Sequence, residues 1–433
     1  MHLTKNLIIY CLALFFLFFQ APKLKAAASS PLPINLSLKQ VIEETLKNNT
    51  SIAVQKYNSK INEQAILERK ADFDAVLDFG VSVREETRQA AGAFANPTKS
   101  RNQNYDWDFS VSQKFLTGAN YELGFNTNRN LTNSTFAGLN PQYTSDINFT
   151  MTQPLLKNFG IDNNKNQIYI AKNNQEISDF QFKDSVIDVI TEAENFYWDL
   201  VFSIEDLKVK KKSLKRAQDL EKQVQAQVEV GTMAPLEMLQ AKSEVASRDQ
   251  LLLSAQDIIL DNEDKLKNIL NYAFDSELGK KRLRPSETAK FDPGTEGTLE
   301  EALQVSLSKR PDLLVKKKEL DNRNIEVRYN KNQIYPTLDL VGSLGLNGIS
   351  GEAINITTGT IQGTSQFGGG YGNSLGDLAS GKYRLWEFGF NLSYPLGNRA
   401  AKSKLVSKKL EVAQLLMDIK DLEQIDTQKM HKV

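Results

Sequence analysis

Histidine and cysteine, which most often supply nucleophilic, acid–base or metal-binding groups, are nearly absent from this chain. Its 433 residues hold two histidines, His2 and His431, and one cysteine, Cys11. A Ser-His-Asp triad or a histidine-based metal site therefore has almost nothing to be built from. No P-loop is present, and no GxGxxG motif follows a strand. We expect no enzyme, no cofactor and no metal.

Charge and hydropathy exclude two further classes of protein. Lys+Arg and Asp+Glu both number 53, so the formal net charge is zero and no basic excess points to nucleic acid. The mean hydropathy of −0.40 excludes a bundle of membrane-spanning helices, although 40% hydrophobic residues can support a core.

The N-terminus has the pattern of a secretory signal peptide. Lys5 precedes the apolar run from Leu7 to Phe19, which is too short to cross a bilayer comfortably, and Ala26-Ala27-Ala28 offers a cleavage site before Ser29. An uncleaved membrane anchor is the alternative. Cys11 lies inside this segment, so cleavage would leave a mature chain without cysteine, which excludes disulfides and thiolate chemistry.

The elements that remain are organised as an internal repeat. Ser37-Leu38-Lys39-Gln40 aligns with Thr298-Leu299-Glu300-Glu301 at an offset of 261 positions, and both segments read as helix-capping boxes. At the same offset Leu77-Asp78 aligns with Leu338-Asp339. Each copy is expected to begin with an amphipathic helix of roughly 35 residues and then to change to the period of a β-strand.

Strand-like alternation of apolar and polar residues is clear in both copies. It is carried by Leu77 to Val83, Ile147 to Met151, Leu338 to Leu346 and Phe388 to Tyr394. Such strands suit a soluble sandwich or a barrel with a lipid face and a wet lumen. Their aromatic residues fit an interfacial girdle or an ordinary core equally well.

Two further strand-like stretches lie near residues 105–128, around Trp107 and Tyr121. The sequence leaves open whether they join the same barrel or form a separate hairpin. The segments between strands are rich in Gly, Asn, Thr and Ser, which predicts long solvated loops at about Thr87–Asn104, Asn126–Ser145 and Asn347–Gly381.

The middle of the chain predicts a long helical hairpin. A seven-residue repeat runs through Val186, Ala193, Leu200, Leu207 and Leu214, and a second runs through Leu239, Ala246, Leu253 and Leu260. Between the two arms, Val230-Gly231-Thr232-Met233-Ala234-Pro235 supplies a glycine to end one helix and a proline to start the next. The hairpin is either purely structural or a docking element with a partner at its tip.

These residues resemble the outer-membrane efflux protein family, of which TolC is typical. The resemblance covers nearly all of the mature chain. It is carried by Leu299-x-x-Ala302-Leu303, Arg310-Pro311-Asp312-Leu313 and Tyr335-Pro336-Thr337-Leu338 at the start of the second repeat, by Val230-Gly231-Thr232 with Leu236-x-x-Leu239-x-Ala241 at the hairpin tip, and by Gln153-Pro154-Leu155-Leu156-Lys157-Asn158-Phe159-Gly160 at a strand-to-helix junction.

The resemblance implies an α+β membrane protein in the cell outer membrane, with helices extending into the periplasm. It implies a homotrimer in which each copy gives four strands to a shared 12-stranded barrel. It also implies a passive exit duct of a tripartite efflux or type I secretion system, whose partners are a periplasmic adaptor, an inner-membrane pump and outer-membrane lipid. Val230, Gly231 and Thr232 would then contact the adaptor.

The resulting domain prediction has four parts: residues 1–28 form the signal peptide, 29–271 the first repeat, 272–297 a linker, and 298–433 a second repeat that is incomplete at its C-terminus. The second copy lacks the returning helical arm of the first, so the gate residues of the family have no counterpart. A truncated product and a shortened family member both fit this departure.

One rival from another class is a periplasmic adaptor or coiled-coil scaffolding protein. Such a protein would also carry a signal peptide and a helical hairpin, but it should have one central hairpin between soluble β domains. The repeat at 261 positions favours the channel. A secreted enzyme with helical insertions is a weaker rival because the chain has so few histidines and cysteines. The cargo cannot be read from the sequence.

Overall fold

The computed structural model describes residues 33–89, 99–134, 136–288, 298–354 and 367–430. They fall into two compact units: the first comprises Met1–Thr50 and Asp188–Asp292, and the second comprises Ser51–Ile187 and Pro293–Val433. The predicted signal peptide and His431 lie outside the described residues. Each unit is considered by itself.

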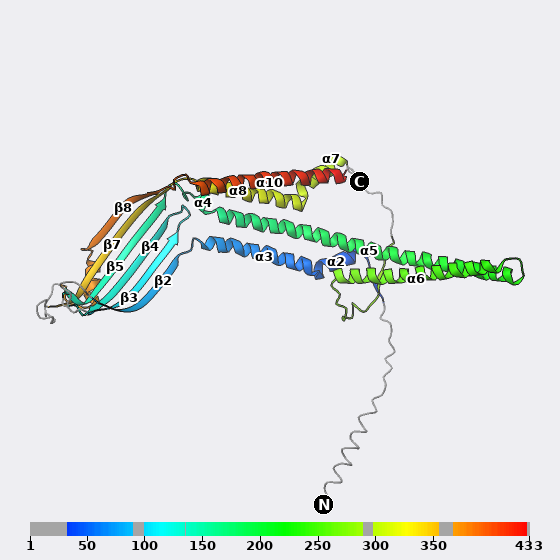
Figure 1. Cartoon of the computed structure of the whole chain (residues 1–433), viewed down its shortest axis with the longest axis horizontal. Coiled ribbons are helices and arrows are strands. Elements are labelled where there is room, and N and C mark those ends of the chain that lie inside the picture. The colour runs from blue at the N-terminus through cyan, green and yellow to red at the C-terminus, as the bar shows by residue number, and fades with distance from the viewer. Residues whose placement is uncertain (1–32, 90–98, 135, 289–297, 355–366, 431–433) are drawn as a thin grey trace, which may run out of the picture. The chain divides into compact units, whose positions relative to one another are not determined.

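The second unit is built around one antiparallel sheet (Figure 1). Among the described residues it has six long strands in the order β2-β3-β4-β5-β7-β8, and all five pairings are antiparallel. The strands are β2 (Val76–Gln89), β3 (Lys99–Lys114), β4 (Asn120–Thr132), β5 (Leu139–Pro154), β7 (Thr337–Ala353) and β8 (Arg384–Ser393).

Helices enter and leave this sheet at one end. Helix α3 (Thr50–Ala71) leads into β2 and α8 (Pro311–Asn332) into β7, whereas β5 leads into α4 (Ile161–Asn164) and β8 into α10 (Arg399–Met430). Because β2 and β7 run opposite to β5 and β8, all four junctions with helices lie at the same end of the strands, which we call the helical end of the sheet. The turn between β3 and β4 also lies at this end, whereas α9 (Tyr371–Ser380), between β7 and β8 in the chain, lies at the opposite end.

The two helices of the second repeat pack against each other through a small apolar core. Leu313 of α8 is buried against Leu415 and Ile419 of α10. An ion-pair cluster flanks this core, in which Lys408 Nζ lies 2.9 Å from carboxylate oxygens of both Glu326 and Glu411. Burial alone would lower the pKa of Lys408, but hydrogen bonds to these carboxylates outweigh it and raise that pKa.

The first unit contains a short parallel strand pair that brings together segments far apart in the sequence. β1 (Ile34–Leu36) pairs with β6 (Leu283–Pro285), and α2 (Leu38–Asn48) and α6 (Pro235–Ile269) lie in the same unit. Tyr197 of α5 (Asn166–Glu229) is fully buried there, and its Oη donates to Leu36 O at 3.3 Å. Burial, the largest influence on Tyr197, raises the pKa of its hydroxyl.

The start of each repeat confirms the capping boxes and corrects the helix length. Ser37 caps α2 and Thr298 caps α7 (Leu299–Lys309), each with the reciprocal bond from the third residue. Each expected 35-residue helix is instead two helices, because Asn49 and Arg310 adopt extended backbone between them. Pro311 explains the second break, since the residue before a proline is disfavoured in the α region.

The three predicted polar loops are largely wrong. β2 and β3 occupy all the described residues of Thr87–Asn104, and β4 and β5 occupy most of Asn126–Ser145. Asn347–Gly381 contains the end of β7 and helix α9. Asn is a poor strand former, but here Asn side chains pair across strands, as when Asn130 Nδ2 donates to Asn104 Oδ1 at 2.5 Å.

The stretches near residues 105–128 belong to the main sheet. They form β3 and β4, which pair with β2 on one side and with β5 on the other. The four strands per copy that the resemblance implied are therefore wrong for this chain, whose described residues contribute six to the sheet.

Within the described residues, no helix is both long and apolar enough to cross a membrane.

Candidate functional site

The tip of the helical hairpin is a tight turn that exposes apolar side chains. α5 ends at Glu229 and α6 begins at Pro235. Gly231 has φ +77°, a conformation that strains most L residues, and both the backbone N and the Oγ1 of Thr232 donate to Gln227 O, at 2.9 and 3.0 Å. Val230 is 74% exposed at this turn.

The structure thus places the three predicted partner-binding residues together at one exposed tip. Val230 offers an apolar surface, Gly231 sets the turn, and Thr232 closes it through Gln227. Leu236 and Leu239 continue the apolar surface onto α6, where both are exposed. A role for this tip in binding an adaptor stays a prediction.

The two arms differ in what their predicted apolar repeats contact. On α5, Ala193 and Leu200 are fully buried, as expected for a seam within the hairpin. On α6, Leu239, Leu253 and Leu260 are exposed, and the buried positions are instead Ala241, Ala255, Ile259 and Leu266. The prediction that the repeat of the second arm packs within the hairpin is therefore wrong. Helix α6 carries two apolar stripes, a buried inner stripe and an exposed outer stripe, and the seven-residue pattern follows the outer stripe.

One face of the six-stranded sheet is apolar over a band several residues high. Cross-strand registers place Leu77, Val111, Leu123, Phe149, Leu344 and Trp386 side by side on this face. Many of these side chains are exposed on the chain, so the aromatic residues of the strands do not form a core within it. We call this surface the apolar face.

Aromatic side chains mark the two borders of the apolar face. Near the strand tips, the ring of Tyr371 lies 4.5 Å from that of Tyr143 and 5.4 Å from that of Trp107. Near the helices, the rings of Phe115 and Tyr121 are 5.2 Å apart. Amphipathic aromatic belts at both limits of an apolar band are typical of surfaces in contact with lipid.

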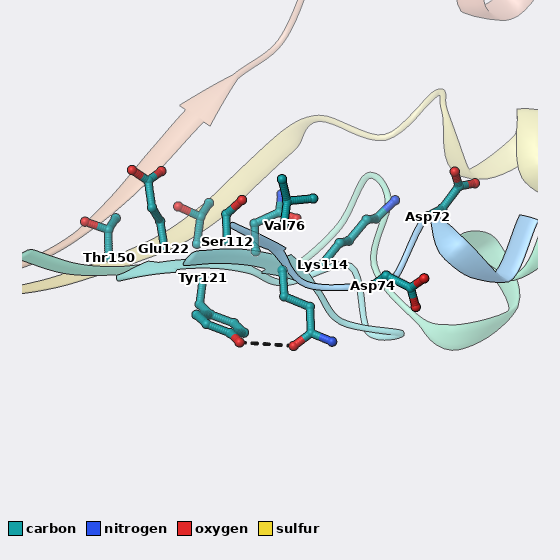
Figure 2. A pocket seen from close by; sticks show the side chains of 11 residues that line it. Asp72, Asp74, Val76, Ser112, Lys114, Tyr121, Glu122 and Thr150 are labelled. Carbon is teal, nitrogen blue, oxygen red and sulfur yellow. Dashed lines mark hydrogen bonds between the residues drawn. The ribbon is translucent and has the colours of Figure 1, made fainter. Parts of the chain in front are cut away.

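The opposite face of the sheet is polar and acidic. Registers place on it Asp78, Glu86, Asp106, Asp108, Glu122, Asp146, Asp339 and Glu387, against the basic residues Arg84, Arg88 and Lys114. Figure 2 shows Ser112, Glu122 and Thr150 pointing to this side near the helical end, whereas Tyr121 points to the other, where its Oη donates to Gln113 Oε1 at 3.0 Å. We call this surface the acidic face.

Helix α9 covers the outer part of β5 and β7 on the side of the apolar face. Ser145 of β5 and Ser374 of α9 are buried, with their Oγ atoms 2.7 Å apart, and Ser350 Oγ donates to Gly370 O at 2.8 Å. Gly348 makes the close approach possible, because a Cβ there would lie 1.9 Å from Ser374 O. No sequence pattern predicts this helix, which lies in a segment expected to be a loop.

The sheet and the hairpin are thus arranged for contact rather than for chemistry. In the part of the chain that is described, no group of three or more His, Cys, Asp or Glu residues is placed to hold a metal ion.

Residues 114–272 match the family model described as outer membrane efflux protein. The chain is thus similar to the outer membrane efflux protein family over 159 of its 433 residues. No match is found among curated protein sequences.

Solved structures are similar to this chain in fold over most of its length. The outer-membrane channel OprN aligns over 90% of this chain and 72% of its own, with a TM-score of 0.59 and 13% identity. The CmeC outer membrane channel of Campylobacter jejuni aligns over 89% and 67%, with a TM-score of 0.56 and 15% identity. The open state of the MtrE outer membrane channel of Neisseria gonorrhoeae aligns over 90% and 71%, with a TM-score of 0.54 and 14% identity.

These likenesses confirm the predicted α+β fold of long helices and antiparallel strands. They extend well beyond the segment matched by the family model, because each alignment includes about nine tenths of the chain. At such low identity they show the fold alone. The roles of individual residues must come from the geometry of this chain.

Proposed function

We propose that this chain is the outer-membrane channel subunit of a tripartite efflux or type I secretion system. In this role it is a passive exit duct, with its strands in the outer membrane and its helices in the periplasm. The observation that carries the proposal is the two-faced sheet, whose apolar face is exposed and bordered by aromatic residues.

A channel requires other copies of the chain, because a six-stranded open sheet cannot lie in lipid by itself. The outer edges of β2 and β8 have no strand beside them among the described residues. Unpaired backbone N–H and C=O groups in hydrocarbon cost several kcal/mol each. Pairing between copies removes these edges, and the resemblance to the efflux family supports three copies as the working assembly.

The proposal gives each face of the sheet a role. The apolar face contacts lipid acyl chains, and the acidic face lines a water-filled lumen. The exposed stripe of α6, with Leu253 and Leu260, packs against a neighbouring copy, and the tip at Val230 contacts a periplasmic adaptor that is bound to an inner-membrane pump. No step of this transport requires a catalytic residue in the chain.

Reconstitution tests the channel itself. The mature chain should appear in the outer-membrane fraction, extract in detergent as an oligomer that dissociates only on heating, and give ion conductance in planar lipid bilayers. A monomer that is soluble in the periplasm without detergent would overturn the proposal and favour the adaptor-like alternative.

Site-specific photo-cross-linking tests the tip. A photoreactive amino acid at Val230 should capture a periplasmic adaptor in cells that express the pump genes. The matched control is the same label at Phe274, which is 90% exposed in the turn after α6 and lies outside the tip. Equal capture at both positions would contradict the tip assignment.

A further inference from the structure

The two edge strands lack a neighbour that their side chains require. On the apolar face, Phe79 of β2 is 69% exposed and Phe390 of β8 is 61% exposed, whereas Phe149 of the interior strand β5 is 37% exposed. Phe149 has a paired strand on both sides, whereas Phe79 and Phe390 each have a paired strand on one side only. The excess exposure at the edges is therefore the surface that one more strand on each side would cover.

The directions of the edge strands allow one edge to be paired with the other. The sheet has an even number of described strands and only antiparallel pairings, so β2 and β8 run in opposite directions. β8 of one copy can therefore pair in antiparallel fashion with β2 of the next, without reversing either sheet. Repeating this contact closes a ring.

The position of the apolar band shifts along the strand direction from β2 to β8, as the strand tilt of a closed barrel requires. Cross-strand partners followed from Leu77 of β2 lead across the sheet to Trp386 of β8. From this line the apolar run Leu77–Val83 of β2 extends away from the helical end of the sheet, whereas the run Trp386–Leu392 of β8 extends toward it. The centre of the band thus shifts by about six residues across one copy. With about 3.3 Å per residue and 4.7 Å between strands, this shift gives a strand tilt of about 35° to the barrel axis, as in known barrels.

One register between copies matches both edge runs completely. It pairs Phe79 with Phe390 of the next copy and Val81 with Phe388, and at the ends of the runs it pairs Leu77 with Leu392 and Val83 with Trp386. The same register sets Asp78 beside Asn391 and Glu85 beside Arg384, so no like charges face each other. It also preserves the shift of about six residues per copy.

We propose that β8 of one copy pairs with β2 of the next in this register, and that three copies close an 18-stranded barrel. The number of copies rests on the proposed function, whereas the six strands per copy and the register rest on the sheet itself. β3 and β4 belong to the barrel wall because each is paired along most of its length on both sides and shares the apolar and acidic faces.

The extra strands widen the conduit in the membrane. Barrel diameter grows roughly in proportion to strand number, so 18 strands at this tilt give a backbone diameter of about 33 Å, against about 22 Å for 12 strands. The cross-section is then about twice as large.

Cysteine pairing tests the register. In a Cys11→Ala background, Phe79→Cys with Phe390→Cys should form disulfides on mild oxidation and shift the denatured, unreduced band from the monomer to the trimer position. Each single variant is a control, and the pair Phe79→Cys with Leu392→Cys, displaced by two residues, should stay monomeric. The register would be overturned if only the displaced pair shifted the band, or if neither pair shifted it.

Direct counting of strands tests the barrel. Electron cryomicroscopy of the oligomer in lipid nanodiscs should resolve 18 strands in a trimer, with β3 and β4 in the wall. A trimer with a 12-stranded barrel would overturn this inference and leave the proposed channel function intact. Failure to enter a membrane at all would overturn the proposed function as well.

Discussion

Gly348 is the residue at which helix α9 meets the sheet. Replacement by alanine would place a Cβ 1.9 Å from Ser374 O, so the helix must move away or the strand must bend. We expect Gly348→Ala to destabilise the contact by about 1–3 kcal/mol, the usual cost of overpacking. The fluorescence of Trp107, whose ring contacts Tyr371 of α9, should shift accordingly.

The control for this prediction is Gly342→Ala. Gly342 lies on the same strand and the same face, and nothing lies within 4 Å of its would-be Cβ. Its alanine variant should leave Trp107 fluorescence unchanged. Identical spectra for the two variants would show that α9 does not depend on the close approach at Gly348.

Glu263 is the buried charge that ties the first unit together. Its side chain is almost fully buried, one oxygen lies 2.8 Å from Arg282 Nε, and the other accepts a hydrogen bond from Leu283 N at 2.5 Å. Glu263→Ala removes both contacts beside the β1–β6 pair. We expect a loss of about 1–3 kcal/mol, because the buried Leu283 N loses its acceptor, whereas Arg282 is more than half exposed and can be solvated.

Thermal loss of the helical circular-dichroism signal measures this effect. Glu244→Ala is the control on the same helix, because Glu244 pairs with Arg248 at an exposed position and such pairs contribute at most about 1 kcal/mol. Equal midpoints for the two variants would mean that Glu263 does not stabilise the first unit.

At the level of elements, the sequence was most informative where local chemistry decides the structure. The hydroxyl and amide or carboxylate of Ser37-x-x-Gln40 and Thr298-x-x-Glu301 satisfy backbone groups within four residues, so both helix starts could be predicted. The apolar alternation of β2, β5, β7 and β8 was equally direct. In the candidate site, the glycine and proline located the hairpin tip for the same reason.

The sequence failed where partners distant in the chain decide. The Asn-rich ends of β3 and β4 read as loops because their strand pairing, such as Asn130 with Asn104, involves neighbours that a local pattern does not contain. The sequence pattern cannot tell the outer stripe of α6 from the inner stripe, which packs within the hairpin, because both stripes are apolar. Likewise, the acidic face emerged only when registers placed strands side by side.

The outer stripe of α6 supports a prediction at the scale of a helix. Leu253 is exposed on this stripe, so Leu253→Glu removes no buried contact within the chain. We expect the variant to fold normally but to lower the temperature at which the oligomer dissociates, because a charge would be desolvated between copies. Semi-native gel electrophoresis after graded heating measures this temperature.

Ser247→Glu is the matched control, since Ser247 is an exposed polar residue of the same helix on a different face. It adds the same charge without touching the stripe and should leave the oligomer intact. If both variants dissociate at the temperature of the unchanged chain, the stripe does not pack between copies.

For the whole molecule, the balance of charge on the acidic face predicts the selectivity of the conduit. The formal charge of the chain is zero, yet carboxylates outnumber basic residues on this one face. A lumen lined by carboxylates raises the local concentration of cations and lowers that of anions within about a Debye length of the wall, about 10 Å at 0.1 M salt. We therefore expect the open channel to prefer cations in dilute KCl and to lose much of this preference at 1 M.

Neutral variants isolate the residues responsible. Asp106 and Asp108 lie on β3, and Asp106 accepts hydrogen bonds from Ser82 and Asn128. Asparagine has nearly the same shape as aspartate, so replacing both residues by Asn keeps the shape of the wall and removes two negative charges per copy. The reversal potential across a KCl gradient should move toward zero in Asp106→Asn/Asp108→Asn. Glu244→Gln, which also removes a carboxylate but at an exposed position in the first unit, should leave it unchanged. A reversal potential that is insensitive to both variants would place these aspartates outside the conducting path, and with them the acidic face as the lumen wall.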